Sequence, residues 1–185
     1  MSEYTGLSEI ISGGQTGADQ GGLLAARAAG LLTGGTAPAK FMTANGPNPL
    51  LRAFGLVAKG NLQSRTMANI IDSDATVVLS ADMASPGTVL TLRYCRERRK
   101  PCLAIDTSIA MTTFGDTGGV LTATTDDWCE ILNDFIRLHS VRTLNVAGNR
   151  ERFNDLRTTW VTEIFLRRTF QLLDLDNLLI RQADL

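Results

Sequence analysis

The stretch ISGGQTGADQ, residues 11–20, places three glycines between an apolar run and a helix-like segment. Because glycine has no Cβ, Gly13, Gly14 and Gly17 allow a sharp turn and a close approach of a ligand to the backbone. A helix that starts after such a turn presents unpaired N–H groups and the positive end of its dipole, and both favour an anion. This corner of the chain is therefore a candidate phosphate-binding loop.

The same turn can also be explained without a ligand. Thr16 and Asp19 have the spacing of a capping box. In this motif Thr16 would cap the helix, and the Asp19 side chain, three residues later, would accept the N–H of Thr16 in return. The glycine spacing is GGxxG, which matches neither a Walker loop nor the GxGxxG dinucleotide fingerprint. Ligand contact and helix capping both stay open, and the two are compatible.

A second corner is SADMASPGTVLT, residues 80–91, between an apolar run and a helical pattern. Gly87, after Pro86, can bring backbone N–H groups toward a ligand. Thr88 can cap the helix while offering its hydroxyl to an anion. A well-made turn with no ligand is the alternative.

A third corner is NVAGNRER, residues 145–152. Asn145 lies near the end of an apolar run, and Asn149 is a candidate helix cap. Arg150 carries a guanidinium suited to a phosphate, although an exposed arginine is commonly only solvated. Both interpretations of Arg150 stay open.

Arg65 stands at the start of a predicted helix, where a cation is unfavourable for the helix dipole. It either binds an anion or pairs with Asp72 or Asp74. The basic run RERRK, residues 96–100, lies instead in the last turn of a helix. The dipole favours cations there, so we interpret this run as structural.

These corners require elements that bring them together, and strand-like and helix-like patterns alternate along the chain. This alternation predicts an α/β domain with a largely parallel sheet, whose strand ends gather the three corners at one edge. Residues 33–55 are rich in Gly, Pro, Asn and Thr and predict a long loop, either a binding loop or a surface excursion. Residues 112–125 predict a second polar excursion. The predicted strands are residues 9–12, 75–80, 101–106 and 142–148, and the predicted helices are residues 17–30 with Gly30 at C′, 67–74, 88–100, 126–139 and 160–173.

Composition narrows the class of protein. A chain of 185 residues, 44% apolar and 20% charged, is expected to form one ordinary globular domain. A net charge of −1 argues against charge-driven binding to nucleic acid or membranes. No apolar stretch approaches the ~18 residues of a spanning helix, so we expect a cytoplasmic protein. The three cysteines and the single histidine have no metal-ligand spacing, and no metal site is predicted.

Five blocks in order carry a family resemblance: ISGGQTGAD, SRTMANIIDSDATVVL, PGTVLT, KPCLAID and LNVAGNRE. The chain resembles the molybdenum-cofactor carrier family, part of the SLOG superfamily of Rossmann-like nucleotide-binding domains. That superfamily includes the phosphoribohydrolases often called lysine decarboxylase-like. The resemblance covers residues 9 to about 152. It implies a Rossmann-like three-layer sandwich with a largely parallel central sheet. Residues 153–185 match nothing in the family pattern, and we expect a single domain over 1–185 in which their helical spacing makes them a C-terminal helical extension.

The resemblance also implies binding positions and shows departures from the family pattern. Pro86 replaces the first glycine of the usual Gly-Gly-Thr turn and removes one N–H donor. Asn149 stands where the family has proline. The family's GGxxPKGR-like loop corresponds to GGTAPAKF, in which Lys40 lies one position later than the family lysine and the arginine is missing. The implied ligand-binding residues are Gly13, Gly14, Gln15, Thr16, Gly17 and Asp19 in the first loop and Pro86, Gly87 and Thr88 in the second, beside the candidates Arg65, Asn145 and Arg150.

We expect a protein that binds a phosphate-bearing, nucleotide-like molecule, either molybdenum cofactor or a nucleotide-derived signal, as carrier, receptor or sequestering protein. The alternative is a nucleoside-monophosphate N-glycosidase. Against it, the glutamate that assists cleavage in the phosphoribohydrolases aligns with Thr91, which cannot act as a carboxylate base. A third interpretation is an interaction subunit whose glycine turns only cap helices. The apolar C-terminal segment favours a homo-oligomer.

Overall fold

The computed structural model describes residues 6–108, 123–151 and 157–183. Six parallel strands form one central sheet in the order β5-β2-β1-β8-β6-β7. The chain is thus α/β and Rossmann-like, as predicted. The strands are β1 (Glu9–Ser12), β2 (Leu32–Ala37), β5 (Leu56–Ala58), β6 (Ala75–Ser80), β7 (Cys102–Asp106) and β8 (Thr143–Gly148).

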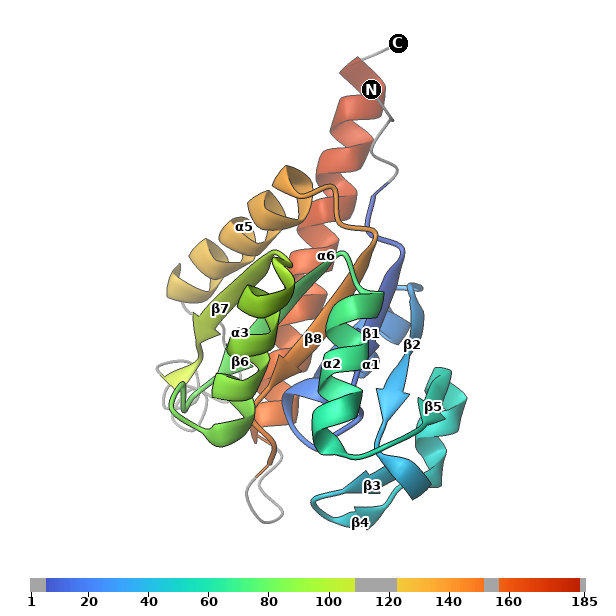
Figure 1. Ribbon diagram of the computed structural model, residues 1–185. Helices are drawn as coiled ribbons and strands as arrows, with labels where there is room; N and C mark the ends of the chain where they lie inside the picture. The colour runs from blue at the N-terminus through green and yellow to red at the C-terminus, as the bar shows by residue number, and fades with distance from the viewer. Residues whose placement is uncertain (1–5, 109–122, 152–156, 184–185) are drawn as a thin grey trace.

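Helices cover both faces of the sheet (Figure 1). One face packs against α1 (Ala18–Ala28), α5 (Ala123–Leu138) and α6 (Arg157–Ala183), whose apolar side chains join those of β1, β6 and β8 in the main core cluster. The other face carries α2 (Leu62–Asp72) and α3 (Pro86–Arg98). The core includes Phe165, Leu166 and Phe170 of α6, so this helix is packed into the same core as the sheet.

The middle strands follow directly from their composition. All six residues of β6, ATVVLS, are buried, as expected for a β-branched strand covered on both faces of a parallel sheet. The predicted boundaries of β1 and β6 agree with the structure. The predicted end of α1 is also confirmed: Gly30 has φ +73°, its N–H donates to Arg27 O, and the Leu31 N–H donates to Ala26 O, which is a Schellman motif.

Residues 33–55 are not the irregular loop that we predicted. They contain most of β2, two 3₁₀ segments (Ala39–Phe41 and Pro49–Phe54) and a small hairpin of β3 (Met42–Thr43) and β4 (Gly46–Pro47). The glycines that indicated a loop have a packing role in β2. A Cβ at Gly35 would lie 2.3 Å from Ser12 O on the neighbouring strand, and φ there is +119°. Glycine-rich sequence here marks close strand packing rather than a missing strand.

Four helices start earlier than predicted: α2, α3, α5 and α6. α2 begins at Leu62 because Asn61 and Ser64 form a reciprocal capping box ahead of it. α3 begins at Pro86, a residue favoured at the first helical position. Of the basic run, Arg96 and Arg98 lie in the last turn of α3, as expected. Lys100 lies beyond that helix, and its Nζ donates instead to Ile71 O and Ser73 O at the end of α2. Residues 112–122 of the predicted polar excursion lie outside the described residues. Residues 123–125 belong to α5.

Candidate functional site

The three predicted corners meet at one edge of the sheet, where β1, β6 and β8 end. A pocket of about 50 Å³ opens between them. Its walls come from α1, α2, α3 and β8, which are far apart in the sequence. The lining residues are Asp19, Arg65, Thr66, Asn69, Gly87, Thr91, Asn145, Ala147 and Gly148.

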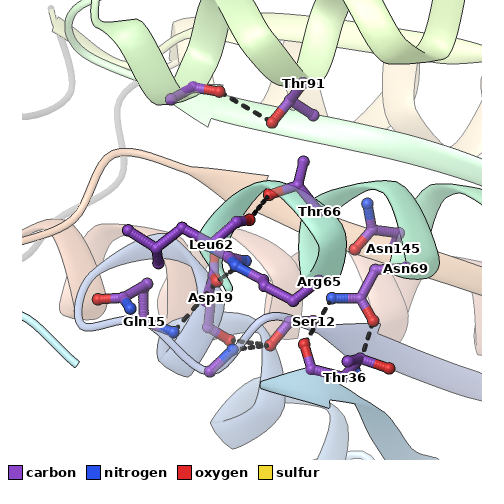
Figure 2. A network of polar contacts seen from close by, with 12 residues as sticks. Ser12, Gln15, Asp19, Thr36, Leu62, Arg65, Thr66, Asn69, Thr91 and Asn145 are labelled. Atoms are coloured by element: carbon purple, nitrogen blue, oxygen red, sulfur yellow. Dashed lines mark hydrogen bonds and ion pairs between the residues drawn. The ribbon is translucent and has the colours of Figure 1, made fainter. Parts of the chain in front are cut away.

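A buried ion pair belongs to the lining of this pocket, and Figure 2 shows the two side chains together. Arg65 Nη1 lies 2.9 Å from Asp19 Oδ2, and the two side chains are 14% and 4% exposed. The prediction that Arg65 pairs with Asp72 or Asp74 was therefore wrong. Asp74 instead accepts the backbone N–H groups of Arg142 and Thr143. Arg65 Nε is buried and has no hydrogen-bond partner among the described residues.

The first glycine loop is occupied by the protein's own carboxylate. The Gln15 N–H donates to Asp19 Oδ2 at 3.1 Å, and the Gly13 N–H also approaches this carboxylate. Burial raises the pKa of Asp19 above its ordinary value of 3.8, although Arg65 and these N–H groups act in the opposite direction. Asp19 thus stands where an external anion would bind the loop.

The capping box predicted for α1 is not formed. The N-cap is Gly17, with φ +89° and no side-chain cap, and Asp19 faces Gln15 and Arg65. The Thr16 hydroxyl is buried without a hydrogen-bond partner among the described residues. The helix starts instead where the Ala18 N–H donates to Asn149 O. Tertiary contact with the third corner therefore replaces the local cap.

The glycines of the first loop serve close packing inside the protein. A Cβ at Gly13 would lie 1.4 Å from Arg65 Nη1, so this glycine makes room for the guanidinium. A Cβ at Gly14 would meet Leu56 Cδ2 at 2.7 Å, and one at Gly17 would meet Asn149 O at 2.3 Å. Gln15 reaches away from the pocket, where Nε2 donates to Met42 O and Oε1 accepts the Ala44 N–H of the hairpin.

At the second corner, Gly87 lines the pocket and Pro86 does not. Thr88 is not the cap that we predicted, because the N-cap is Ser85, which makes no side-chain cap. The Thr88 hydroxyl is buried and bonded to the hydroxyls of Ser80 and Ser85. The N–H groups of Gly87 and Thr88 have no hydrogen-bond partner within the described part of the chain.

At the third corner, Asn145 is buried in the pocket wall, and its Nδ2 donates to Thr76 Oγ1 at 3.1 Å. Asn149 is not a helix cap. Its Oδ1 accepts from Ser80 Oγ and from the Asp82 N–H, both at 2.9 Å, which ties β8 to the loop after β6. Arg150 is exposed and does not line the pocket.

Sequence reasoning missed several lining residues, although a helical spacing could have indicated them. Asn69 lies four positions after Arg65 and three after Thr66, and Thr91 lies four positions after Gly87. Residues three and four apart share a helix face, so each predicted residue implied a neighbour in the site. Ala147 and Gly148 belong to the strand end itself.

The described residues contain no group of three or more His, Cys, Asp or Glu side chains placed to hold a metal ion. Cys95, Cys102 and Cys129 are free cysteines. No helix within the described ranges combines the length and apolar character needed to cross a membrane.

The fold and the position of the pocket define an α/β, Rossmann-like domain. Residues 10–168 match the family described as "Circularly permutated YpsA SLOG family", and the chain belongs to this family. The chain is also similar to the crystal structure of a "Putative molybdenum carrier protein" from Syntrophus aciditrophicus SB, with 28% sequence identity and a TM-score of 0.74. The likeness covers 89% of this chain and 94% of that one. Among curated proteins, none matches the chain.

Proposed function

We propose that the protein binds a phosphate-bearing, nucleotide-like small molecule at the carboxyl edge of the sheet and acts as a carrier, receptor or sequestering protein. The observation that carries this proposal is a polar pocket at the junction of three strand–helix turns, lined by Arg65, whose Nε is buried with no hydrogen-bond partner among the described residues. In parallel α/β sheets, ligands bind outside the carboxyl ends of the strands. The similarity to the "Putative molybdenum carrier protein" supports a small-molecule cargo.

The pocket can enclose only one end of such a ligand. Its volume of about 50 Å³ is far below the roughly 300 Å³ at which ordinary ligand sites begin. The rest of a nucleotide or of molybdenum cofactor would extend past Gly87 into the open. There, the free N–H groups at the start of α3 are placed to receive a phosphate.

Native mass spectrometry of freshly purified protein tests the proposal, followed by denaturation and identification of any released molecule. A stoichiometric mass of a nucleotide or pterin is the expected result. If the bare polypeptide mass is found, titration with nucleotides and with the cofactor follows, monitored by thermal shift. Absence of both a co-purified and a titrated ligand would overturn the proposal.

Substitution of Gly87 separates ligand binding from stability. A Cβ at Gly87 would meet nothing within 4 Å, so the fold should accept Gly87→Leu with little change in Tm. The added side chain would cover the N–H groups of α3, and we expect ligand affinity to fall about tenfold or more. Val89→Leu, an exposed position on the same helix and outside the pocket lining, is the control. Equal affinity for all three proteins would place the ligand elsewhere.

A second candidate function is cleavage of the N-glycosidic bond of a nucleoside monophosphate. One observation favours it: Asp19 and Thr91 line the same pocket, so a carboxylate is present although Thr91 carries none. Liquid chromatography of nucleotides incubated with the protein would detect the free base. Asp19→Asn should abolish such release, and no release by the wild type would exclude this function for the nucleotides tested.

We further propose a cytoplasmic protein that acts as a homo-oligomer and binds neither nucleic acid nor membranes. The net charge of −1 supports the last point, since it provides no field to attract polyanions. Light scattering coupled to size exclusion measures the oligomeric state, and a monomer mass at working concentrations would contradict that part.

A further inference from the structure

Two of the three cysteines lie against each other where α3 meets β7. Cys95 is on the buried face of α3 and is 1% exposed, and Cys102 is the first residue of β7 and is half-buried. The helix and the strand pack side by side (Figure 1), and the chain turns back between them, where the Lys100 N–H donates to Cys95 O. Both cysteines are free, and their thiols form a side-chain hydrogen bond with each other.

This contact divides the acidity of the two thiols unequally. The hydrogen bond from the Cys102 thiol lowers the pKa of Cys95 from 9.0 to about 7, although burial acts in the opposite direction. The hydroxyl of Thr76, which is paired with Cys102 in the register of β6 and β7, adds a smaller lowering. The same contact raises the pKa of Cys102. At neutral pH the pair therefore carries a substantial share of thiolate at Cys95, with a protonated thiol beside it.

The third cysteine differs in each of these features. Cys129 is 0% exposed on α5, on the opposite face of the sheet from α3, and its thiol donates to Phe165 O at 3.7 Å. Burial raises the pKa of Cys129. The thiolate is the reactive form of cysteine, so a buried thiol of this kind is inert. Cys129 thus provides an internal reference for the other two.

We propose that Cys95 and Cys102 are a redox-active pair that hydrogen peroxide converts to a reversible intramolecular disulfide. The Cys95 thiolate attacks one peroxide oxygen and breaks the O–O bond, so its sulfur is oxidised to a sulfenic acid, and the hydroxide that leaves takes the Cys102 proton to form water. The Cys102 thiolate then attacks the sulfenic sulfur, which forms the S–S bond and expels hydroxide. This hydroxide takes up the proton that Cys95 first lost. Two thiols and one peroxide thus give one disulfide and two waters.

The position of the pair gives the disulfide a structural consequence. β7 is an edge strand of the six-stranded sheet, so the pair borders the edge of the molecule on the half-buried side of Cys102. On α3, Gly87 and Thr91 lie eight and four positions before Cys95, which places all three on one face of the helix, and the first two line the pocket. The disulfide would therefore fasten to β7 the helix that forms one wall of the pocket. This consequence does not depend on which ligand the pocket binds.

The test treats the full chain, reduced and freed of reductant, with a small molar excess of hydrogen peroxide, followed by alkylation and peptide mass mapping. We expect a mass loss of about 2 Da, the two thiol hydrogens, a linked Cys95–Cys102 peptide and an alkylated Cys129. Dithiothreitol should restore all three thiols. Amide hydrogen exchange at the end of α3 should be slower in the oxidised protein, because the link prevents α3 from separating from β7.

Two serine variants assign the roles within the pair. Cys102→Ser keeps a hydroxyl that can donate to Cys95 but removes the second sulfur, so peroxide should leave a sulfenic acid at Cys95, which dimedone traps. Cys129→Ser is the matched control and should form the disulfide as the wild type does. If Cys102→Ser does not fold, the wild-type peptide map decides alone.

Several outcomes would overturn the inference. One is that Cys95 and Cys102 both remain open to alkylation after peroxide treatment. Another is equal oxidation of Cys129, which would mean that unfolding rather than the pair sets the reactivity. Disulfides between two chains, seen as a dimer on a non-reducing gel, would also exclude an intramolecular switch. Absence of dimedone labelling in Cys102→Ser would overturn the role of Cys95, and unchanged exchange in α3 would overturn the fastening of this helix. The proposed function would stand in each case, since its ligand is measured separately.

Discussion

At the scale of residues, Asp19 and Arg65 change what the first glycine loop can do. The loop has the composition of a phosphate cradle, but its N–H groups meet the Asp19 carboxylate, and the guanidinium of Arg65 lies over Gly13. The fold thus provides its own anion and the matching cation. A ligand at this edge would meet the Asp19–Arg65 pair instead of a loop of free N–H groups.

The raised pKa of Asp19 predicts a pH dependence of stability. Because burial raises this pKa above 3.8, the fold favours the protonated acid relative to the unfolded chain. The resulting stabilisation is fully present below the unfolded pKa and is lost as the pH rises through the folded one. Asp19→Asn removes this loss, so as the pH rises above the ordinary value of 3.8 the free energy of unfolding of the variant should rise relative to that of wild type.

Urea unfolding at several pH values measures this difference. Thr91→Val, which changes no charge in the same pocket, should show no such trend and is the control. A variant that loses stability relative to wild type as the pH rises would show that the attraction of Arg65 for the carboxylate outweighs its burial.

At the scale of elements, single side chains attach peripheral segments to the site. The Gln15 side chain donates one hydrogen bond to the β3–β4 hairpin and accepts another from it. The Asn69 side chain likewise donates to and accepts from the backbone of Thr36 in β2. Glu151 accepts the N–H groups of Thr158 and Thr159 and so satisfies the first turn of α6 from outside the helix. These amide and carboxylate side chains satisfy backbone groups of elements other than their own.

The Gln15 contacts predict how the hairpin responds to substitution. Gln15→Ala removes two hydrogen bonds, each with a net contribution of about 1 kcal/mol, from a segment that has few others. We expect faster amide hydrogen exchange in residues 42–47 and little change in global unfolding. Gln15→Glu keeps the acceptor for Ala44 but loses the donor to Met42, so it should show an intermediate effect. Unchanged amide exchange in Gln15→Ala would mean that the two Gln15 hydrogen bonds are not needed to hold the hairpin in place.

At the scale of the whole molecule, β8 links the parts that form the site. It lies between β1 and β6, and the residues that follow it contact both neighbouring loops through Asn149. The backbones approach closely here, since a Cβ at Gly148 would lie 1.8 Å from Leu79 O. The two halves of the sheet, and with them the walls of the pocket, are thus held together at the carboxyl end of β8.

Gly148→Ala should therefore destabilise the entire domain. The added methyl group would have to push β6 away from β8, and we expect a loss of about 3 kcal/mol or more in the free energy of unfolding. Gly87→Ala, where the Cβ would lie in open space, should leave stability almost unchanged. Thermal unfolding of both variants measures the contrast. Equal Tm values would show that the two strands can separate at little cost.

The sequence by itself determined the alternation of strands and helices, the parallel sheet and the edge at which the site lies. Hydrophobic runs such as ATVVLS and the Schellman glycine at 30 are local signals, and local signals can be read from neighbouring residues. Strand β2 was not predicted, because Gly34 and Gly35 interrupt the β-branched pattern that indicates a strand. Glycine is present at these positions because a neighbouring strand lies close by, and that contact cannot be predicted from local sequence.

The tertiary structure alone decided the partners within the site. Asp19 and Arg65 are 46 positions apart, and Ser80 and Asn149 are 69 apart. No local spacing specifies such pairs, so the sequence left Arg65 between binding an anion and pairing with a nearby aspartate, and left Thr16 between ligand contact and capping its own helix. Packing of α1 and α2 against opposite faces of one sheet brings Asp19 and Arg65 together at the strand ends. A buried charge needs an oppositely charged partner that is buried with it. Arg65 therefore pairs with Asp19 rather than with the aspartate nearest in sequence.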